Sequence, residues 1–399
     1  MLDRHCIILY AASLWAPAFA PLISVTGLPL QITDIMIPFL GLIIWRQAHA
    51  LSLAAWIIAA FLWIASASHV SPLAGHQVLW LWQISLPMMH VLLHAVIFAH
   101  PERIQPWFTS FHIGAWVSLM LAGVQIFTNG QIGDVRNNVA FSLPPQAHRG
   151  VALMPEVSTL STFISIYIAL NFAQMHQTGG RRPLISIIAG SIYLIFSGSK
   201  AAIIFCPILI TSLILGRAER VGRKMLAIII VALVAFGAFT TSLADRNSSG
   251  ASEKSAQLRA ATMLAALAPL TQGDVIGRGI GAQSNIATDA VAIARAHHMR
   301  FRKIPTGINS FIAAAIYEQG LLFVIVTTVT FAGLGVYTRS SDAHDTLLAW
   351  MGLWCWLASA MVIGYRGIYI NWLPYAAIMA LVSRHAYRAR PLYTAYLKG

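Results

Sequence analysis

The segment IPTGINSFIAAAIYEQG, residues 304–320, closes the long polar stretch of this chain and continues directly into an apolar run. The polar stretch begins near residue 243 and is rich in positive charge. Before Glu318 it holds eight basic residues, Arg246, Lys254, Arg259, Arg278, Arg295, Arg300, Arg302 and Lys303, against four acidic ones, Asp245, Glu253, Asp274 and Asp289. A basic segment between apolar runs predicts an anionic partner at a membrane surface, and phosphate is the commonest such group.

The rest of the chain is strongly apolar. Of its 399 residues, 58% are hydrophobic and 10% are charged, and the mean hydropathy is +0.70. A soluble domain has about 25% charged residues. Apolar runs of roughly 15–22 residues recur along the chain, which predicts an all-α, polytopic helical membrane protein. We expect one integral membrane domain over residues 1–399, with a large periplasmic loop at 243–310 inserted between two spans.

The apolar runs predict about twelve transmembrane helices. They lie near 6–25, 31–45, 51–69, 78–99, 110–128, 156–175, 183–197, 201–216, 225–243, 311–337, 345–363 and 367–383. The run at 311–337 is long for one crossing. We therefore expect its first turns, through Glu318, to sit at the membrane interface or to line a cavity.

Charge in the short loops predicts the orientation. With the N-terminus in the cytoplasm, the turns at 26–30 and 70–77 lie outside and hold no Lys or Arg. The loops and tail that would face the cytoplasm carry Arg46, Arg103, Arg181, Arg182, Arg217, Arg220, Arg223, Lys224, Arg339, Arg384, Arg388, Arg390 and Lys398. Both termini are therefore expected in the cytoplasm. The net charge of +13 is then explained by these loops and a basic site, without nucleic acid.

Several basic residues fall on the outer side and break this rule. They are Arg136 and Arg149 in the loop at 129–155, Lys200 and Arg366 in tight turns, and those of the 243–310 loop. Charges placed against the rule are costly and often functional. The alternative is that each one only reaches the lipid headgroups. Because several would converge on one face, we favour a functional site there.

Two of the motifs expected on the outer face lie before the large loop. In RGVALMPEVSTLSTF, residues 149–163, Pro155 and Glu156 suit the first turn of a helix. Glu156 is either a helix cap or a carboxylate beside Arg149 that binds or deprotonates a sugar hydroxyl. In the turn SGSK, residues 197–200, Lys200 and the amides that open the next helix form either an anion site or a plain turn.

Two further motifs lie in and after the large loop. In GDVIGRGIGA, residues 273–282, the glycines permit either a close approach of backbone to a ligand or a flexible loop. Asn309 and the sequence Glu318-Gln-Gly form the fourth motif, at the start of a helix. Between them, residues 285–303 predict a helix. Its residues Arg295, His298 and Arg302 would share one face, which is either a cradle for a diphosphate or a solvated surface.

No metal site is expected. Cys6, Cys206 and Cys355 lie inside apolar runs and are predicted to be small core residues. His90 and His94 stand four residues apart without an obvious third ligand, so we predict packing or interface roles for them.

The order and sidedness of these motifs resemble a known family. Arg-x(6)-Glu at 149–156 is followed by Ser-x-x-Lys at 197–200, Gly-x-Gly-x-Gly at 277–281 and Asn-x(8)-Glu-x-Gly at 309–320. Together they are similar to the bacterial O-antigen polymerase and O-antigen ligase superfamily, the Wzy-type polymerases and their relatives. The resemblance covers roughly residues 110–340, together with the matching topology.

The resemblance implies a GT-C-like, metal-independent glycosyltransferase without a cofactor, in the bacterial inner membrane, with its active site facing the periplasm. A polymerase of this kind transfers a growing glycan from undecaprenyl diphosphate onto a new lipid-linked repeat unit. The implied partners are the undecaprenyl-diphosphate-linked oligosaccharide and membrane lipid, with a chain-length regulator and a flippase as further candidates. Nucleic acid is not among them.

The resemblance also implies residue roles. Arg149, Arg278 and Arg302, with Lys200 and Arg366 as further candidates, would hold the diphosphate and stabilise charge as the carrier leaves. The other expected substrate-binding residues are Arg136, Arg295 and Asn309. The candidates for the base are, in order, Glu156, Glu318 and His298.

Two other functions stay open. In ligases of this superfamily a His commonly precedes the Asn of the last motif, whereas this chain has Ile308, which favours a polymerase. Lys200 likewise stands where relatives often have Arg. A lipid-linked oligosaccharide flippase or other transporter is the alternative of a different class, and it predicts charged residues within the spans.

Overall fold

The computed structural model describes residues 2–15, 24–25, 28–29, 33, 36, 77–131, 150–154, 157–178, 181–197, 251–271, 275–299, 308, 310–361 and 369–396. This part of the chain is almost entirely helical, which confirms the all-α prediction. The α-helices are α1 (Leu2–Ser13), α4 (Gln77–Ala99), α5 (Pro101–Phe127), α6 (Val157–Thr178), α7 (Arg181–Phe196), α10 (Ala251–Thr271), α11 (Ile286–Ala296), α12 (Phe311–Tyr337), α13 (Ala343–Met361) and α14 (Leu373–Tyr396). Short 3-10 helices, η4 (Ala282–Asn285) and η5 (Tyr369–Trp372), precede α11 and α14.

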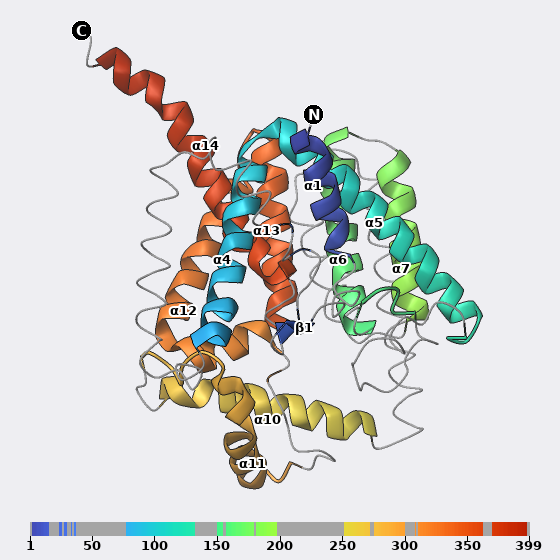
Figure 1. The fold of residues 1–399 in the computed structure, drawn as a ribbon, viewed down its shortest axis with the longest axis vertical. Coiled ribbons are helices and arrows are strands. Elements are labelled where there is room, and N and C mark those ends of the chain that lie inside the picture. The colour runs from blue at the N-terminus through green and yellow to red at the C-terminus, as the bar shows by residue number, and fades with distance from the viewer. Residues whose placement is uncertain are drawn as a thin grey trace.

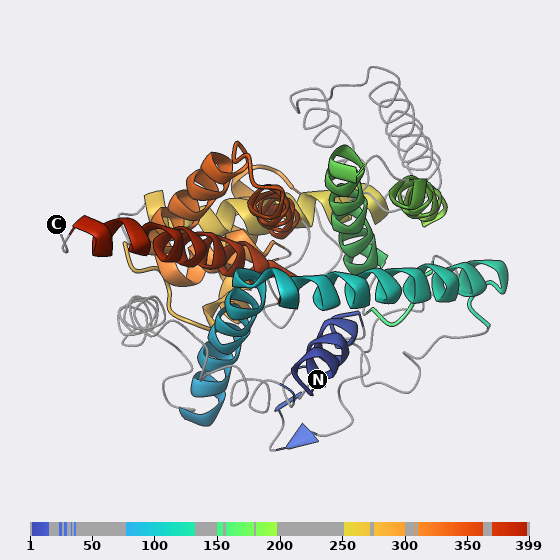
Figure 2. The same ribbon diagram turned by 90° about the horizontal axis from the view of Figure 1, so that it is seen from above.

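The longer helices form a bundle with a helical cap across one end (Figure 1). Helix α4 packs on α14, α6 packs on α7, and α13 contacts both α14 and α6. Helices α10 and α11 lie across the end of the bundle where α12 begins (Figure 1). Helix α1 and the end of α14 lie toward the opposite end. Figure 2 shows α5 crossing the bundle, with α1 packed beside it.

Sequence features explain where several helices begin. Pro101 stands in the first turn of α5 with Glu102, where a missing N–H is harmless and a carboxylate is favoured. The Ser310 side chain accepts a hydrogen bond from the Ala313 N–H at 3.2 Å and caps α12. Asp342 does the same for α13, because its carboxylate accepts from the His344 N–H at 2.8 Å.

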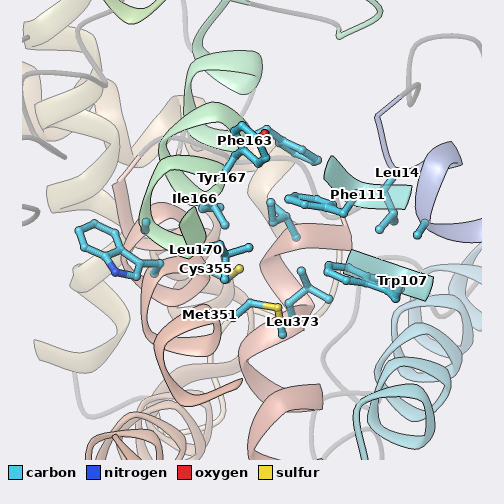
Figure 3. Packing of buried hydrophobic residues seen from close by; sticks show 14 of the residues in the cluster. Leu14, Trp107, Phe111, Phe163, Ile166, Tyr167, Leu170, Met351, Cys355 and Leu373 are labelled. Carbon is cyan, nitrogen blue, oxygen red and sulfur yellow. The ribbon is translucent and has the colours of Figure 1, made fainter. Parts of the chain in front are cut away.

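One cluster of buried apolar side chains joins the helices of the bundle (Figure 3). Trp107 and Phe111 of α5 stack with their ring centroids 5.0 Å apart, and Phe163 of α6 and Leu373 of α14 belong to the same cluster. Cys355 of α13 is buried there, as predicted for a small core residue. Close packing of this kind is the main force that holds helices together inside a lipid bilayer.

The first predicted span is wrong in its length. A helix was expected through 6–25, but α1 ends at Ser13, and β1 (Ser24–Val25) pairs antiparallel with β2 (Leu28–Pro29). Pro17 and Pro21 account for the difference, because proline lacks the N–H that a helix interior requires. Helix α1 is about 18 Å long at about 1.5 Å per residue, which is less than the roughly 30 Å hydrocarbon core of a bilayer.

Two helices of the described chain are long and apolar enough to cross a membrane, α5 and α12. Shorter apolar helices cover Pro87–Ala99 and Thr159–Met175. The predicted spans at 51–69, 201–216 and 225–243 lie outside the described residues, as does all of 31–45 except residues 33 and 36. The remaining predicted spans coincide with helices α4, α5, α6, α7, α12, α13 and α14 to within nine residues at each end, except that α14 continues 13 residues past the predicted end at 383.

A buried ion pair closes the end of the bundle opposite α10 and α11. The Asp345 side chain is fully buried, and its Oδ1 accepts a hydrogen bond from Nε of Arg384 at 2.8 Å. Its Oδ2 lies 3.1 Å from Nε2 of His385. Arg384 also donates to the Ala99 carbonyl at 3.2 Å, so it joins the ends of α4, α13 and α14. Arg384, expected as a charge of the cytoplasmic tail, is therefore a structural residue of the bundle.

Replacing Asp345 with alanine should destabilise the protein strongly. Arg384 would lose its 2.8 Å partner and keep only the 3.6 Å contact to the carboxylate of Asp342. Losing a hydrogen bond between charged groups costs about 1.5–3 kcal/mol. The measurement is the midpoint of thermal denaturation in detergent. Glu102→Ala is the matched control, because that carboxylate is 70% exposed, and its loss should leave the midpoint nearly unchanged. Equal midpoints for the two variants would contradict the assignment.

Candidate functional site

Helix α12 is broken at Gly320. This glycine has φ 62° and ψ −147°, a backbone conformation that is open almost only to glycine. The part of α12 before the break packs with α10 at the end of the bundle, and the part after it runs along α13 (Figure 1). The first turns of the long apolar run, through Glu318, are therefore separated from the rest of α12 by this break. That they sit at the membrane interface or line a cavity stays a prediction.

A loop rich in glycine, residues 275–281 and here called the glycine loop, fills this break. The Arg278 N–H donates to the Tyr317 carbonyl at 2.8 Å, and the Gly279 N–H donates to the Glu318 carbonyl at 2.9 Å. In return the Leu321 N–H donates to the Val275 carbonyl at 2.9 Å. A break in a helix removes partners from buried backbone groups, and leaving such groups unpaired is costly. The glycine loop supplies the partners that the helix has lost.

Two glycines make this contact possible. A Cβ on Gly277 would lie 2.6 Å from the backbone nitrogens of Gln319 and Gly320, and a Cβ on Gly320 would lie 2.3 Å from the Val275 carbonyl oxygen. Gly277 also has a positive φ of 81°. The glycines thus permit a close backbone approach, but what they approach is the chain's own helix. A close approach to a ligand stays a prediction. Two motifs that lie about 40 residues apart in the sequence form one structural unit.

Replacing Gly320 with alanine should disrupt this unit. The new methyl group would overlap the Val275 carbonyl, and alanine would be strained at this φ, so we expect a loss of at least about 2 kcal/mol. The measurement is the thermal denaturation midpoint in detergent. Gly335→Ala is the matched control on the same helix, where a Cβ meets nothing within 4 Å, and it should be neutral or slightly stabilising. A Gly320→Ala protein as stable as the control would refute the close contact.

Glu318 contacts the glycine loop twice. Its backbone carbonyl holds the Gly279 N–H, and its carboxylate Oε1 accepts from the Gly281 N–H at 2.9 Å. The residue is 0% exposed. Glu318, expected as a candidate base, therefore lies inside the contact between the loop and the helix break.

The helix that follows the glycine loop is fixed to the same part of α12. The Tyr317 hydroxyl donates to Asp289 Oδ2 of α11 at 2.7 Å. Around Tyr317, small side chains let α10, α11 and α12 pack closely. They are Ala261, Ala265 and Ala266 of α10, Ala290 and Ala294 of α11, and Ala313 and Ala314 of α12. The glycine loop, the three helix segments and the Tyr317–Asp289 hydrogen bond make one cap over the end of the bundle.

The predicted helix at 285–303 is shorter than expected. Helix α11 ends at Ala296, and His298 adopts a left-handed backbone conformation with φ 53°. The Met299 N–H donates to the Ala294 carbonyl at 2.8 Å, and the His298 N–H donates to the Arg295 carbonyl at 3.4 Å. This is the Schellman pattern that ends helices. Arg295 and His298 consequently do not share one continuous helical face, and Arg302 lies outside the described residues.

Three of the expected contributors to a basic site are exposed on this cap. Arg278 projects from the glycine loop, and Arg295 and His298 belong to the last turn of α11 and its end. The side chains that would contact an anion here belong to the glycine loop and to α11, whose backbones are held in place by the hydrogen bonds to α12 and by the alanine packing. The other expected site residues, Arg136, Arg149, Glu156, Lys200, Arg302, Asn309 and Arg366, lie outside the described part of the chain.

The segment between Arg149 and Glu156 is described, at residues 150–154, and it is held by a side chain that the sequence did not single out. Gln125 of α5 is buried, and its Oε1 accepts from the N–H groups of Val151 at 2.8 Å and Ala152 at 2.7 Å. Its Nε2 donates to the Ala152 carbonyl at 3.2 Å. From α7, the Tyr193 hydroxyl donates to the Gly150 carbonyl at 2.9 Å. In the sequence, the indication of these hydrogen bonds is one amide side chain, Gln125, within an apolar run.

Replacing Gln125 with leucine should loosen the segment beside Arg149. Two buried N–H groups would lose their acceptor, at a cost of about 1–3 kcal/mol for each. We expect a lower thermal midpoint and faster amide hydrogen exchange at Val151 and Ala152. Gln105→Leu is the control on the same helix, because Gln105 is exposed. Unchanged exchange in Gln125→Leu would argue against these hydrogen bonds.

The two histidines of α4 pack in the core, as predicted. His90 and His94 are buried, and their Nδ1 atoms lie 2.6 and 3.1 Å from the Tyr10 hydroxyl of α1. Within the ranges that the structure describes, no group of three or more His, Cys, Asp or Glu residues could hold a metal ion.

Comparison of the sequence with protein-family models and with curated proteins finds no match.

Proposed function

We propose that this chain is a glycan polymerase of the bacterial inner membrane, similar to the O-antigen polymerase and ligase superfamily. It would transfer a growing glycan from undecaprenyl diphosphate onto a new lipid-linked repeat unit at the periplasmic face. The observation that carries the proposal is the cap. It presents exposed Arg278 and Arg295 from a rigid base of hydrogen bonds and small side chains, at the end of an apolar helical bundle.

The proposal is a polytopic membrane protein with both termini in the cytoplasm and the active site facing the periplasm. Support comes from the arrangement of the described helices. Helix α1 and the end of α14 lie toward one end of the bundle, and the cap covers the other end (Figure 1). Helices α5 and α12 are long and apolar enough to cross a membrane.

The proposed reaction is a displacement at the anomeric carbon of the donor glycan. The acceptor hydroxyl oxygen forms the new bond to this carbon, and the bond between the carbon and the diphosphate oxygen breaks. The hydroxyl proton passes to a base, for which Glu156, Glu318 and His298 are the candidates. Undecaprenyl diphosphate leaves with the bonding electrons. Arg149, Arg278 and Arg302, with Lys200 and Arg366, would bind the diphosphate and stabilise the charge that develops on it.

The polymerase fits the described residues better than a flippase does. A route for charged headgroups through the membrane predicts charged side chains within the spans. The buried acidic residues of the described chain are Glu318 and Asp345. Glu318 lies before the break in α12, and Asp345 lies in the first turn of α13. Both therefore stand at the ends of the bundle.

The Ile308 position bears on the ligase alternative. Where ligases of the superfamily commonly carry a His, Ile308 is buried among the alanines of the cap. It cannot supply an acid or a base. This substitution favours polymerisation over transfer to a final acceptor.

Removal of Arg278 tests the proposal in cells. A strain without this chain is complemented with wild type, Arg278→Ala or Arg149→Ala, and lipid-linked glycans are separated by size. We expect each variant to lower the yield of long chains by about 100-fold, the effect typical of losing one charge-stabilising group. Arg339→Ala is the control, because Arg339 is exposed at the opposite end of α12.

The products distinguish the three functions. Single repeat units left on the carrier in the deletion strain mean polymerase. Long chains that stay on the carrier mean ligase, and absence of lipid-linked units from the periplasm means transport. Full complementation by both variants would remove Arg278 and Arg149 from the site.

A further inference from the structure

The carboxylate of Glu318 has a structural contact within the protein. A general base must bring a carboxylate oxygen within about 2.6–3.2 Å of the acceptor hydroxyl. The Glu318 side chain instead reaches into the glycine loop, where Oε1 accepts from the Gly281 N–H. The residue is 0% exposed, beneath a loop that is itself fixed to the helix break.

Tyr317 and Glu318 together occupy three N–H groups of the glycine loop. The two backbone carbonyls accept from Arg278 and Gly279, and the Glu318 carboxylate accepts from Gly281. A row of N–H groups in a glycine loop is a common anion site. Here these three groups already have acceptors within the protein, so these amides do not form an anion site.

We propose that Glu318 is a positioning residue, whose carboxylate locks the glycine loop onto the broken end of α12 and so fixes the direction of Arg278 toward a diphosphate. The catalytic role of this contact, here called the lock, rests on the proposed polymerase function. The lock itself, the hydrogen bond from the Gly281 N–H to the Glu318 carboxylate, is a feature of the fold. Proton transfer then falls to Glu156 or His298.

The substitution Glu318→Gln has a different effect on a carboxylate that holds the loop than on a carboxylate that acts as the base. A glutamine at position 318 keeps an oxygen that can accept from the Gly281 N–H, although a neutral acceptor binds more weakly than a carboxylate. It cannot accept a proton from a sugar hydroxyl at neutral pH. Alanine removes the acceptor altogether. The Glu318→Gln and Glu318→Ala pair therefore separates holding the loop from taking the proton.

The test uses the full-length protein and two independent readouts. The first is the yield of long lipid-linked chains in the complemented strain. The second is hydrogen–deuterium exchange, in detergent, of peptides that cover residues 275–281. We expect Glu318→Gln to retain polymerisation within about fivefold of wild type and to keep the loop protected. Glu318→Ala should lose polymerisation by at least tenfold and exchange these amides at least tenfold faster.

A matched carboxylate serves as control. Glu102→Gln and Glu102→Ala alter an exposed glutamate at the start of α5, far along the chain from the cap. Neither should change the yield of chains or the exchange of residues 275–281. If Glu318→Ala does not accumulate in the membrane, Glu318→Asp replaces it, because its shorter side chain withdraws the acceptor from Gly281.

The results show whether Glu318 holds the glycine loop or acts as the base. An inactive Glu318→Gln protein with a protected loop would overturn the proposal and make Glu318 the base. Wild-type exchange in Glu318→Ala would overturn the lock. If wild type does not polymerise glycans at all, the proposed function fails, and the exchange data still decide whether Glu318 holds the loop.

Discussion

The hydrogen bonds between the glycine loop and the broken end of α12 are the interaction on which the cap depends. Without the carbonyl of Val275 and the N–H groups of Arg278 and Gly279, a break at Gly320 would leave buried backbone groups unpaired. The break in turn lets the first part of α12 lie across the bundle, where α10 packs against it and the Tyr317 hydroxyl donates to Asp289 of α11. These backbone hydrogen bonds therefore determine both the shape of the cap and the position of Arg278 in the glycine loop.

Much of the fold follows from the apolar runs, because a helix that satisfies its own backbone is the simplest structure for such a run. The ends of α4, α12 and α13 were predicted to within a few residues for this reason. The predicted ends of two helices were wrong because of local backbone effects. Pro17 and Pro21 lie within the run in which α1 stops at Ser13, and a left-handed His298 ends α11.

The site was predictable in its residue types and less so in its contacts. The sequence singled out Gly277 and Gly320 separately, but their pairing depends on tertiary structure that no local pattern records. Gln125 was missed for a similar reason, since one amide in an apolar run gives no indication of its partner. Glu318 was recognised as unusual, and only its bond to Gly281 shows which way its carboxylate points.

The position of the break also has a consequence for the surrounding lipid. The straight part of α12 after Gly320, residues 321–337, is about 25 Å long at about 1.5 Å per residue. A bilayer has a hydrocarbon core of about 30 Å, and it adapts to a shorter helix by thinning locally. If this part of α12 spans the membrane as proposed, lipid headgroups beside it are drawn toward the bilayer centre. The glycine loop then stands at the depth of the lipid phosphates, where a lipid-linked diphosphate would reach Arg278 without leaving the membrane surface.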